Sequence, residues 1–385
     1  MKVLWICGLP NIVRLEGAGE VISPTPTAAW SWIMGHLPPP NGVELHIICP
    51  VGGLKKKRID FKYLGVHWHC FKRHRFELPM LWIRFYLQIK SFVKDLNPDV
   101  IHGWGGETGC GRVATLLSNK AIVSVQGLLL LFWQLLNIKG ERRVNFSTRL
   151  AWFCEKKTYD GAKILLVESE ASKEGLKQYY DKRSVLVPHP LRQEFLEAKV
   201  SSANSEKIKF VFVGSLVDRK GAMDAVRAFS MVQSDDIELV MIGSGPDALP
   251  ITKFISQKGL EKKIRLAGNL SVKDLVLELS GAQFFLLPSY GDTGPTALKE
   301  ALSMELYPIC YRNSGPENLI NHYGCGKLVK TGDIDALSDA ISDCTRNVSK
   351  YSECARQTSM FVRSELSRTN VWKELQTIYL QNQCN

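Results

Sequence analysis

Short apolar runs alternate with segments of helical length along the whole chain. In the first half the runs occupy residues 3–7, 43–49, 66–71, 100–102, 122–125, 164–167 and 185–187, and in the second half residues 208–213, 237–242, 264–266, 284–287, 308–311 and 327–329. Continuous apolar strands separated by helices are typical of parallel sheets that are covered on both faces. The pattern therefore predicts an α/β protein built on parallel sheets.

A polar stretch near residues 200–207, rich in Ser and Asn and without hydrophobic periodicity, divides this pattern in two. We expect one doubly wound α/β domain over residues 1–200, a second over 206–356, and a helical segment over 357–385. In such sheets ligands bind outside the carboxyl ends of the strands. A cleft between two facing domains is therefore the expected binding site.

The composition also predicts the class of protein and its cellular compartment. A chain of 385 residues with 45% hydrophobic and 23% charged residues is ordinary for a soluble globular protein of two domains. Residues 1–7 predict a buried strand rather than a signal peptide, and the longest apolar run, 127–136, is too short to span a bilayer. The ten cysteines are scattered and form no Cys-x-x-Cys pair, which favours a reducing, cytoplasmic location.

The net charge of +11 indicates an anionic partner. Two basic clusters, 55–58 and 72–75, are interleaved with aromatic residues and could rest on an anionic bilayer, at the inner face of the cell membrane. The aromatic residues are Trp68, Phe71, Phe76, Trp82, Phe85 and Tyr86. The alternative is that the cations are solvated and the aromatic residues belong to the core. Because no nucleic-acid-binding motif appears and the cations do not align on one predicted helix, we expect no nucleic-acid partner.

Residues 284–301 carry the most specific signal in the chain. A buried apolar run ends at Pro288, a turn carries Asp292, a Gly-Pro pair at 294–295 opens a helix, and Glu300 follows about two turns later. A helix N-terminus suits a phosphate, because its N–H groups and dipole favour negative charge. The neighbouring carboxylates suit sugar hydroxyls, although Asp292 could instead cap the helix. Together these groups match the needs of a nucleotide-sugar.

Three other strand ends in the second half carry glycine turns, at Gly214, Gly243 and Gly268. The first of them leads to Arg219 and Lys220, which could neutralise a departing diphosphate or could be surface charges. The turn at Gly268 could place its backbone against a nucleobase, or could be a plain turn.

The series Val-Gly-x-Leu…Lys-Gly, Ile-Gly-x-Gly-Pro and Pro-Ser…Asp-x7-Glu-Ala resembles the retaining glycosyltransferases of the GT-B fold called family 4, or glycosyl transferases group 1. The resemblance implies two facing Rossmann-like domains with a cleft between them. Residues 1–200 would bind the acceptor, residues 206–356 would bind the nucleotide-sugar donor, and residues 357–385 would pack back toward the N-terminal domain.

The resemblance also implies roles for single residues of the second half. Glu300 would hold the donor ribose, and Lys220, helped by Arg219, would bind the diphosphate. Asp292 stands where the family usually has Glu and would contact hydroxyls of the transferred sugar. The remaining donor-binding candidates act through their backbone, and they are Gly214, Gly268, Gly294, Pro295, Thr296 and Ala297.

In the first half, the strand end at residues 98–102 resembles the family's Pro-Asp-x-x-His, and Gln126 stands where many relatives have His. A Gln side chain can hydrogen-bond a sugar but cannot act as a base. In the family's retaining chemistry the leaving phosphate takes the acceptor proton, so Gln126 is compatible with it. The catalytic candidates are Asp292, Lys220, Gln126 and His102, where His102 would line the cleft or would be a structural histidine. The family's glycine loop near the N-terminus corresponds to 27–30 or to 17–19.

We expect no essential metal and no cofactor. Residues 333–335 match an Asp-x-Asp pattern, but they open a helix, so capping explains Asp333 better. The predicted function is retaining hexosyl transfer from a UDP- or GDP-type sugar donor to a saccharide or lipid-linked acceptor of polysaccharide, lipopolysaccharide or capsule synthesis. Two alternatives stay open: another GT-B enzyme, such as a nucleotide-sugar epimerase or a phosphorylase, and a basic nucleic-acid-binding protein. The missing Gly-x-Gly-x-x-Gly after the first strand argues against a dehydrogenase.

Overall fold

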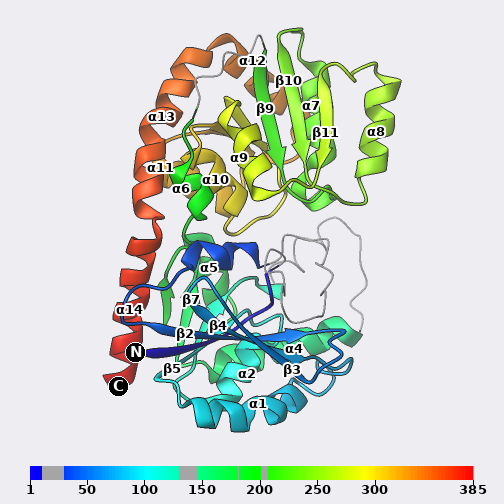
Figure 1. The fold of residues 1–385 in the computed structure, drawn as a ribbon. Coiled ribbons are helices and arrows are strands. Elements are labelled where there is room, and N and C mark those ends of the chain that lie inside the picture. Colours follow the sequence, from blue (N-terminus) through cyan, green and yellow to red (C-terminus); the bar gives the residue numbers. More distant parts are fainter. Residues whose placement is uncertain (11–29, 130–145, 181, 201–206, 385) are drawn as a thin grey trace. The chain divides into compact units, whose positions relative to one another are not determined.

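The computed structural model describes residues 1–10, 30–129, 146–180, 182–200 and 207–384. The chain divides into two compact units, Met1–Pro190 with Arg368–Asn385, and Leu191–Ser367. Each unit is a largely or wholly parallel sheet with helices on its faces (Figure 1). The predicted doubly wound α/β architecture is therefore confirmed.

The first unit contains an eight-stranded sheet in the order β3-β4-β2-β1-β5-β6-β7-β8. Its strands are β1 Lys2–Ile6, β2 Glu44–Val51, β3 Arg58–Tyr63, β4 Val66–Lys72, β5 Val100–Trp104, β6 Ile122–Val125, β7 Ile164–Val167 and β8 Ser184–Leu186. The helices are η1 Ser31–His36, α1 Ile83–Leu96, α2 Cys110–Leu117, α4 Phe146–Gly161, α5 Glu170–Lys177 and α14 Arg368–Cys384. The described strand pairs are parallel except β3–β4, which is an antiparallel hairpin.

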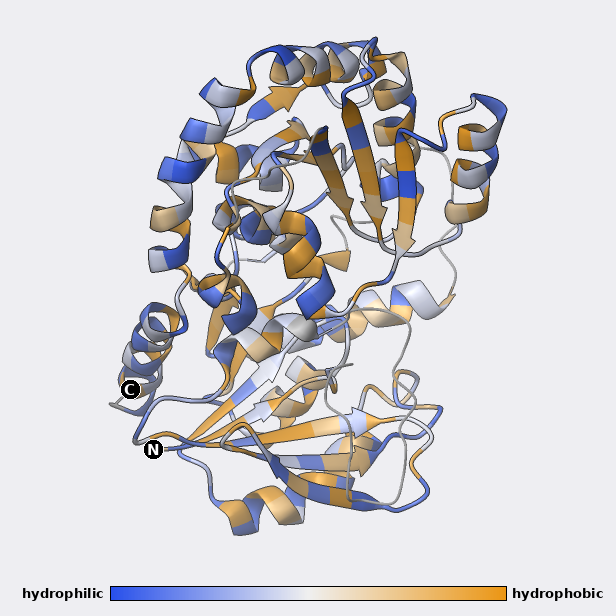
Figure 2. Cartoon of the chain, turned by 45° about the horizontal axis from the view of Figure 1, so that its top comes forward, coloured by the Kyte–Doolittle hydropathy of each residue, from blue (hydrophilic) through white to orange (hydrophobic). Residues whose placement is uncertain are grey.

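The hairpin was not expected from the sequence, where only β4 was recognised. Leu64 and Gly65 connect its strands, and both have positive φ, 49° and 72°, as a two-residue type I′ turn requires. The strand β3 alternates charged and apolar residues and lies at the sheet edge, where one face and one edge meet solvent. A half-exposed edge strand lacks the continuous apolar run that reveals the central strands (Figure 2).

Aromatic side chains fill the core of the first unit, among them Trp5, which is fully buried. The helix α14 contributes to this core: Trp372 stacks on Trp5 with ring centroids 5.5 Å apart, and Tyr379 accepts a hydrogen bond of 3.0 Å from the Trp5 indole. The last helix of the chain is therefore part of the first unit.

The second unit contains a six-stranded parallel sheet in the order β11-β10-β9-β12-β13-β14. Its strands are β9 Ile208–Val213, β10 Ile237–Ile242, β11 Ile264–Gly268, β12 Phe284–Leu287, β13 Tyr307–Tyr311 and β14 Lys327–Val329. Its helices are α6 Gln193–Glu197, η2 Asp218–Lys220, α7 Ala222–Met231, α8 Ala248–Gln257, α9 Val272–Ser280, α10 Thr296–Ser303, α11 Ser314–Tyr323, α12 Ile334–Arg346 and α13 Val348–Glu365. The strand order reverses between β9 and β12, which is the switch point where ligands bind in such sheets.

The boundary between the two units lies at a different residue than the sequence predicted. The division falls after Pro190 rather than near 200, because Phe195 of α6 is fully buried in the core of the second unit. The expected helical segment 357–385 is also divided: α13 places Val362 in the second core, whereas α14 belongs to the first. Among the described helices, none has both the length and the apolar character needed to cross a membrane.

Candidate functional site

Two loops at the carboxyl ends of β9 and β12 lie against each other in the second unit. The Tyr290 N–H donates to the Arg219 carbonyl at 2.8 Å, and the Arg219 guanidinium donates to the Gly291 carbonyl at 2.7 Å. Gly221 makes this approach possible: its φ is 67°, and a Cβ there would lie 1.8 Å from the Pro288 carbonyl oxygen. Two motifs that are 72 residues apart in sequence thus form one surface.

The two loops bring together Lys220 and Asp292, whose side chains form an ion pair between Nζ and Oδ2. Both are largely buried, with 19% and 14% of the side chain exposed. Asp292 is not the cap of α10, since Pro295 occupies the N-cap position. The capping alternative for Asp292 is therefore wrong, and its carboxylate serves an ammonium group instead.

The helix α10 begins at Thr296 without a side-chain cap, because Pro295 has no acceptor to offer. The N–H groups of its first turn lie just after the loop that holds Asp292, and unsatisfied N–H groups at a helix start favour anions. Asn313 steadies this loop: its amide donates to the Ser289 carbonyl at 2.7 Å and its Oδ1 accepts from the Asp292 N–H at 3.3 Å.

Glu300 lies further along α10 and is 5% exposed. Burial raises the pKa of its carboxyl, and the Arg192 guanidinium opposes that rise. Both contacts from Arg192, 3.0 Å from Nε and 2.7 Å from a terminal nitrogen, fall on Oε1. Sequence reasoning missed Arg192, which follows the last apolar run of the first half and carries no motif.

The glycine turns pack the ends of neighbouring strands closely. Gly243 has φ of 136°, and a Cβ there would lie 1.9 Å from the Gly214 carbonyl oxygen. Its N–H donates to the Gly268 carbonyl at 2.8 Å, and the Gly214 N–H donates to the Ile242 carbonyl at 3.0 Å. These turns therefore lie together at the edge of the sheet that carries Lys220.

Two tyrosines, of which Tyr311 is buried and Tyr290 partly buried, brace the same region. The Tyr290 and Tyr311 hydroxyls both donate to Oδ2 of Asp224, at 2.7 Å and 3.1 Å. Burial, with the Asp224 carboxylate, raises the pKa of Tyr290 to about 12. No sequence motif predicts this brace, because its members lie on three separate elements.

His102 in the first unit does not line a site. It is fully buried, and its Nδ1 and Nε2 pair with the Tyr379 hydroxyl at 2.7 Å and the Ser124 hydroxyl at 2.8 Å. Burial, with His189 nearby, lowers its pKa to about 3, so the imidazole is neutral. The catalytic prediction for His102 is corrected here: both nitrogens serve the core.

Gln126 lies in a small polar cluster at the carboxyl ends of β6, β7 and β8. Its Oε1 is 3.2 Å from Nε2 of His189, which is also 3.3 Å from a carboxylate oxygen of Glu168. The Trp32 ring stacks on His189 with centroids 4.2 Å apart. Glu168 and His189 were missed, although Glu168 directly follows the strand β7 and His189 comes three residues after the end of β8.

The remaining sequence predictions have different outcomes in the structure. Asp333 caps α12, accepting from the Ala336 N–H at 2.9 Å, so the capping prediction is confirmed. Trp68, Phe71, Trp82 and Phe85 are buried, which removes them from the proposed membrane surface and favours the core alternative. The glycine-loop candidates 17–19 and 27–29 lie outside the described residues.

Comparison with known proteins assigns both units. Residues 36–194 match the model described as Glycosyltransferase Family 4, and residues 194–359 match Glycosyl transferases group 1. Among curated relatives, an uncharacterised glycosyltransferase of Methanocaldococcus jannaschii is 20% identical over 245 residues, covering 59% of this chain and 60% of the relative. The Bacillus subtilis protein TuaC, a putative teichuronic acid biosynthesis glycosyltransferase, is 26% identical over 259 residues, covering 65% and 62%.

The chain thus spans about three fifths of these relatives. Two solved structures extend the similarity of fold over nearly the whole chain. Sucrose-phosphate synthase from Thermosynechococcus elongatus has a TM-score of 0.79 at 15% identity, covering 99% of this chain and 98% of that one. Anabaena HepE, solved in complex with UDP and glucose, has a TM-score of 0.70 at 12% identity, covering 99% and 100%. The two matched models and the shared fold show that the chain belongs to the GT-B glycosyl transferases of group 1.

Proposed function

We propose that this protein is a retaining glycosyltransferase that moves a sugar from a nucleoside-diphosphate donor to an acceptor of polysaccharide or glycolipid synthesis. The observation that carries the proposal is the Lys220–Asp292 ion pair beside the start of α10. The pair places one cation and one carboxylate where a helix N-terminus already favours a phosphate. Membership of the family supplies the reaction class.

In this proposal the donor binds along α10. Lys220 and Arg219 neutralise the diphosphate as it leaves, and the N–H groups at the start of α10 bind its oxygens. Glu300 binds the ribose, because Arg192 occupies Oε1 and a hydroxyl can donate to the same carboxylate. When the diphosphate takes Lys220, the Asp292 carboxylate becomes available to the hydroxyls of the sugar.

The retaining step is supported by two predicted positions of the first unit that are unsuited to act as a base. Gln126 cannot accept a proton at neutral pH. His102 is buried, and both of its ring nitrogens are hydrogen-bonded to hydroxyl groups. We therefore propose that a leaving phosphate oxygen takes the acceptor proton, on the same face as the new bond. The positive charge that this oxygen needs comes from Lys220 and the helix start, so we expect no essential metal for the transfer.

A UDP-type donor has the best support, because HepE shares this fold and was solved with UDP and glucose; a GDP-type donor is the alternative. A polysaccharide acceptor is supported by the relative TuaC, named for teichuronic acid biosynthesis. A cytoplasmic location and contact with an anionic membrane remain predictions. Binding to anionic liposomes that falls steeply with salt would support the contact, and equal binding to neutral liposomes would contradict it.

Thermal shift against UDP, GDP, ADP and CDP and their common sugar adducts tests the donor site. A ligand at 100 times its dissociation constant stabilises by about 2.7 kcal/mol. We expect one nucleotide family to stabilise the wild type and the control Glu317→Gln, which loses only an exposed ion pair with Arg312. The variant Glu300→Gln, which keeps an acceptor for Arg192, should lose most of the shift. No shift with any nucleotide in the wild type would contradict the proposal.

A second assay separates the alternatives within the fold. A nucleotide-sugar epimerase would convert the donor without an acceptor, and a phosphorylase would require free phosphate. Release of the nucleoside diphosphate that depends on a saccharide acceptor, with retained anomeric configuration by NMR, supports the transferase. Competition by nucleic acid for the nucleotide-sugar would instead support the basic nucleic-acid-binding alternative.

A further inference from the structure

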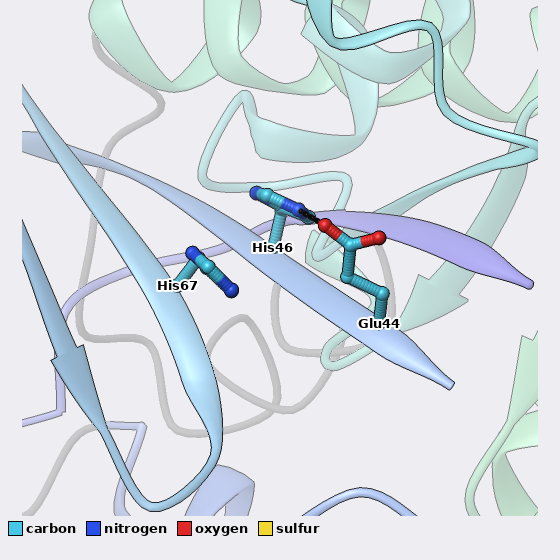
Figure 3. Close-up of side chains that lie close together, drawn as sticks. All are labelled: Glu44, His46 and His67. Atoms are coloured by element: carbon cyan, nitrogen blue, oxygen red, sulfur yellow. Dashed lines mark hydrogen bonds and ion pairs between the residues drawn. The ribbon is translucent and has the colours of Figure 1, made fainter. Parts of the chain in front are cut away.

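Three potential metal ligands meet at the amino-terminal ends of β2 and β4 in the first unit. The strands run parallel with His46 directly opposite His67, and Glu44 lies two residues before His46, on the same face of β2. One ligand atom from each residue lies within 4.8 Å of the others. Figure 3 shows the carboxylate and the two imidazoles gathered over these neighbouring strands.

An ordered chain of hydrogen bonds stands behind this group. Nδ1 of His46 is 3.0 Å from Nε2 of His69, and Nδ1 of His69 is 2.7 Å from Oδ1 of Asp60. Both histidines are buried, with 5% and 8% exposed. Ligand histidines in metal sites are commonly oriented in this way, through the ring nitrogen that does not bind the metal.

The order of donors and acceptors in this chain bears on the contact between His46 and Glu44. The Asp60 carboxylate accepts, so His69 carries its proton on Nδ1 and presents a lone pair at Nε2. His46 then donates from Nδ1, and in its neutral form it carries a lone pair on Nε2. That lone pair faces a carboxylate oxygen of Glu44 at 2.9 Å. Either a second proton on His46 or a metal ion bound to both atoms would complete this contact.

We propose that Glu44, His46 and His67 bind one divalent transition-metal ion, for which Zn²⁺ is the best candidate. Two imidazole nitrogens and one carboxylate oxygen are a donor set that Zn²⁺ accepts, with a water in the fourth position. Mg²⁺ and Ca²⁺ prefer sites made of oxygen ligands. Glu44 is exposed and His67 is partly exposed, so the ion and its water have a path from solvent.

The ion would stabilise the fold rather than take part in sugar transfer. Glu44 is the first residue of β2 and His67 the second residue of β4, whereas Gln126 follows the carboxyl end of β6. The ion would join β2 to β4, and β4 carries the edge strand β3 from which Asp60 reaches His69. The inference therefore stands or falls independently of the donor site.

Direct titration of chelator-treated, untagged protein tests the inference, with a chromophoric chelator as competitor and Zn²⁺, Co²⁺ and Mg²⁺ as probes. We expect one Zn²⁺ per chain, an increase in Tm with Zn²⁺ but not with Mg²⁺, and the visible absorption of tetrahedral Co²⁺. The variant His67→Gln removes one ligand and leaves the His46–His69–Asp60 chain in place. It should weaken Zn²⁺ binding by at least ~100-fold, whereas Asp60→Asn should weaken it by roughly 10–100-fold.

The matched control is His322→Gln in the second unit. His322 also pairs with a carboxylate, Glu365, at 3.0 Å, but it is not part of the three-residue group. Its removal should leave Zn²⁺ affinity unchanged. No stoichiometric Zn²⁺ binding by the wild type would overturn the inference, and so would equal affinity in the wild type and in His67→Gln.

Discussion

Two carboxyl groups in each unit lie in contrasting environments. In the second unit Asp292 and Glu300 each contact a cation, Lys220 and Arg192. In the first unit both carboxylate oxygens of Glu155 instead accept from the Leu129 N–H, at 3.2 Å, and burial raises the pKa of Glu155 to about 8. Burial also raises the pKa of Glu107, to about 7.

The difference indicates what each unit is suited to bind. An ion pair such as Lys220–Asp292 can exchange its internal partner for a charged ligand, so the second unit suits a diphosphate. A carboxyl group that stays protonated near neutral pH can donate to and accept from hydroxyl groups. Under the proposed function, the first unit with its Gln126–His189 contact binds a neutral saccharide rather than an anion.

The largest effect is expected for Lys220→Ala. The substitution removes the cation from the proposed diphosphate site and leaves the Asp292 carboxylate, only 14% exposed, without its ammonium partner. We expect kcat/KM for the donor to fall by roughly 10²–10³-fold, the size of effect seen when one charge-stabilising donor is lost. Steady-state release of the nucleoside diphosphate measures this.

The control for Lys220→Ala is Lys327→Ala, which breaks another ion pair of the second unit, with Asp343 at 2.6 Å. Its effect should be limited to stability, without a change in kcat/KM of the folded protein. Equal kinetic losses in the two variants would mean that Lys220 acts through folding, and the contrast between the units would lose its functional meaning.

The sequence predicted that Lys220 and Asp292 belong to one candidate site, because both lie in motifs. Lys220 and Asp292 follow apolar strands through glycine turns, and parallel strands bring such turns to one edge. The partner of Glu300 could not be found in the same way. Arg192 lies before α6, and its place beside α10 depends on tertiary packing, since Leu191 and Phe195 on either side of it are buried in the second core.

The first unit shows the reverse limit. The position of His102 at a strand end suggested a site. Its Nδ1, however, is hydrogen-bonded to the hydroxyl of Tyr379, a residue of α14 that lies 277 positions later in the sequence. No local pattern announces such a contact. The predicted domain boundary was wrong for a related reason. The polar stretch at 200–207 marks where regular secondary structure stops, whereas the boundary between the two compact units follows Pro190.

An intermediate effect is expected for the pH dependence of stability. A carboxyl group whose pKa rises on folding, from 4.5 to about 8 for Glu155, holds a proton that the unfolded chain has lost, so stability falls as pH rises through this range. Below pH 6.5 the lowered pKa of buried His102 acts in the opposite direction. Between pH 6.5 and 8 the Glu155 contribution should therefore cost about 2 kcal/mol.

Urea unfolding of the wild type and Glu155→Gln at pH 6.5 and 8 measures this contribution. The variant keeps an acceptor for the Leu129 N–H and cannot titrate, so its stability should fall less over the interval. The control Glu353→Gln, which removes an exposed carboxylate paired with Arg356, should follow the wild type. The same slope in all three proteins would show that Glu155 is ionised in the folded state and would weaken the contrast between the units.

The smallest effect is expected for Gln126→Ala, which tests whether the first unit's polar cluster contacts the acceptor. A hydrogen bond contributes about 0.5–1.5 kcal/mol, so the acceptor KM should rise by up to ~10-fold while the donor KM stays constant. The control is Gln178→Ala, an exposed position at the end of α5. If the donor KM rose equally, Gln126 would act on the whole protein, and the division of donor and acceptor between the units would be wrong. A change confined to the acceptor KM would instead support this division, because the substitution leaves the Lys220–Asp292 pair untouched.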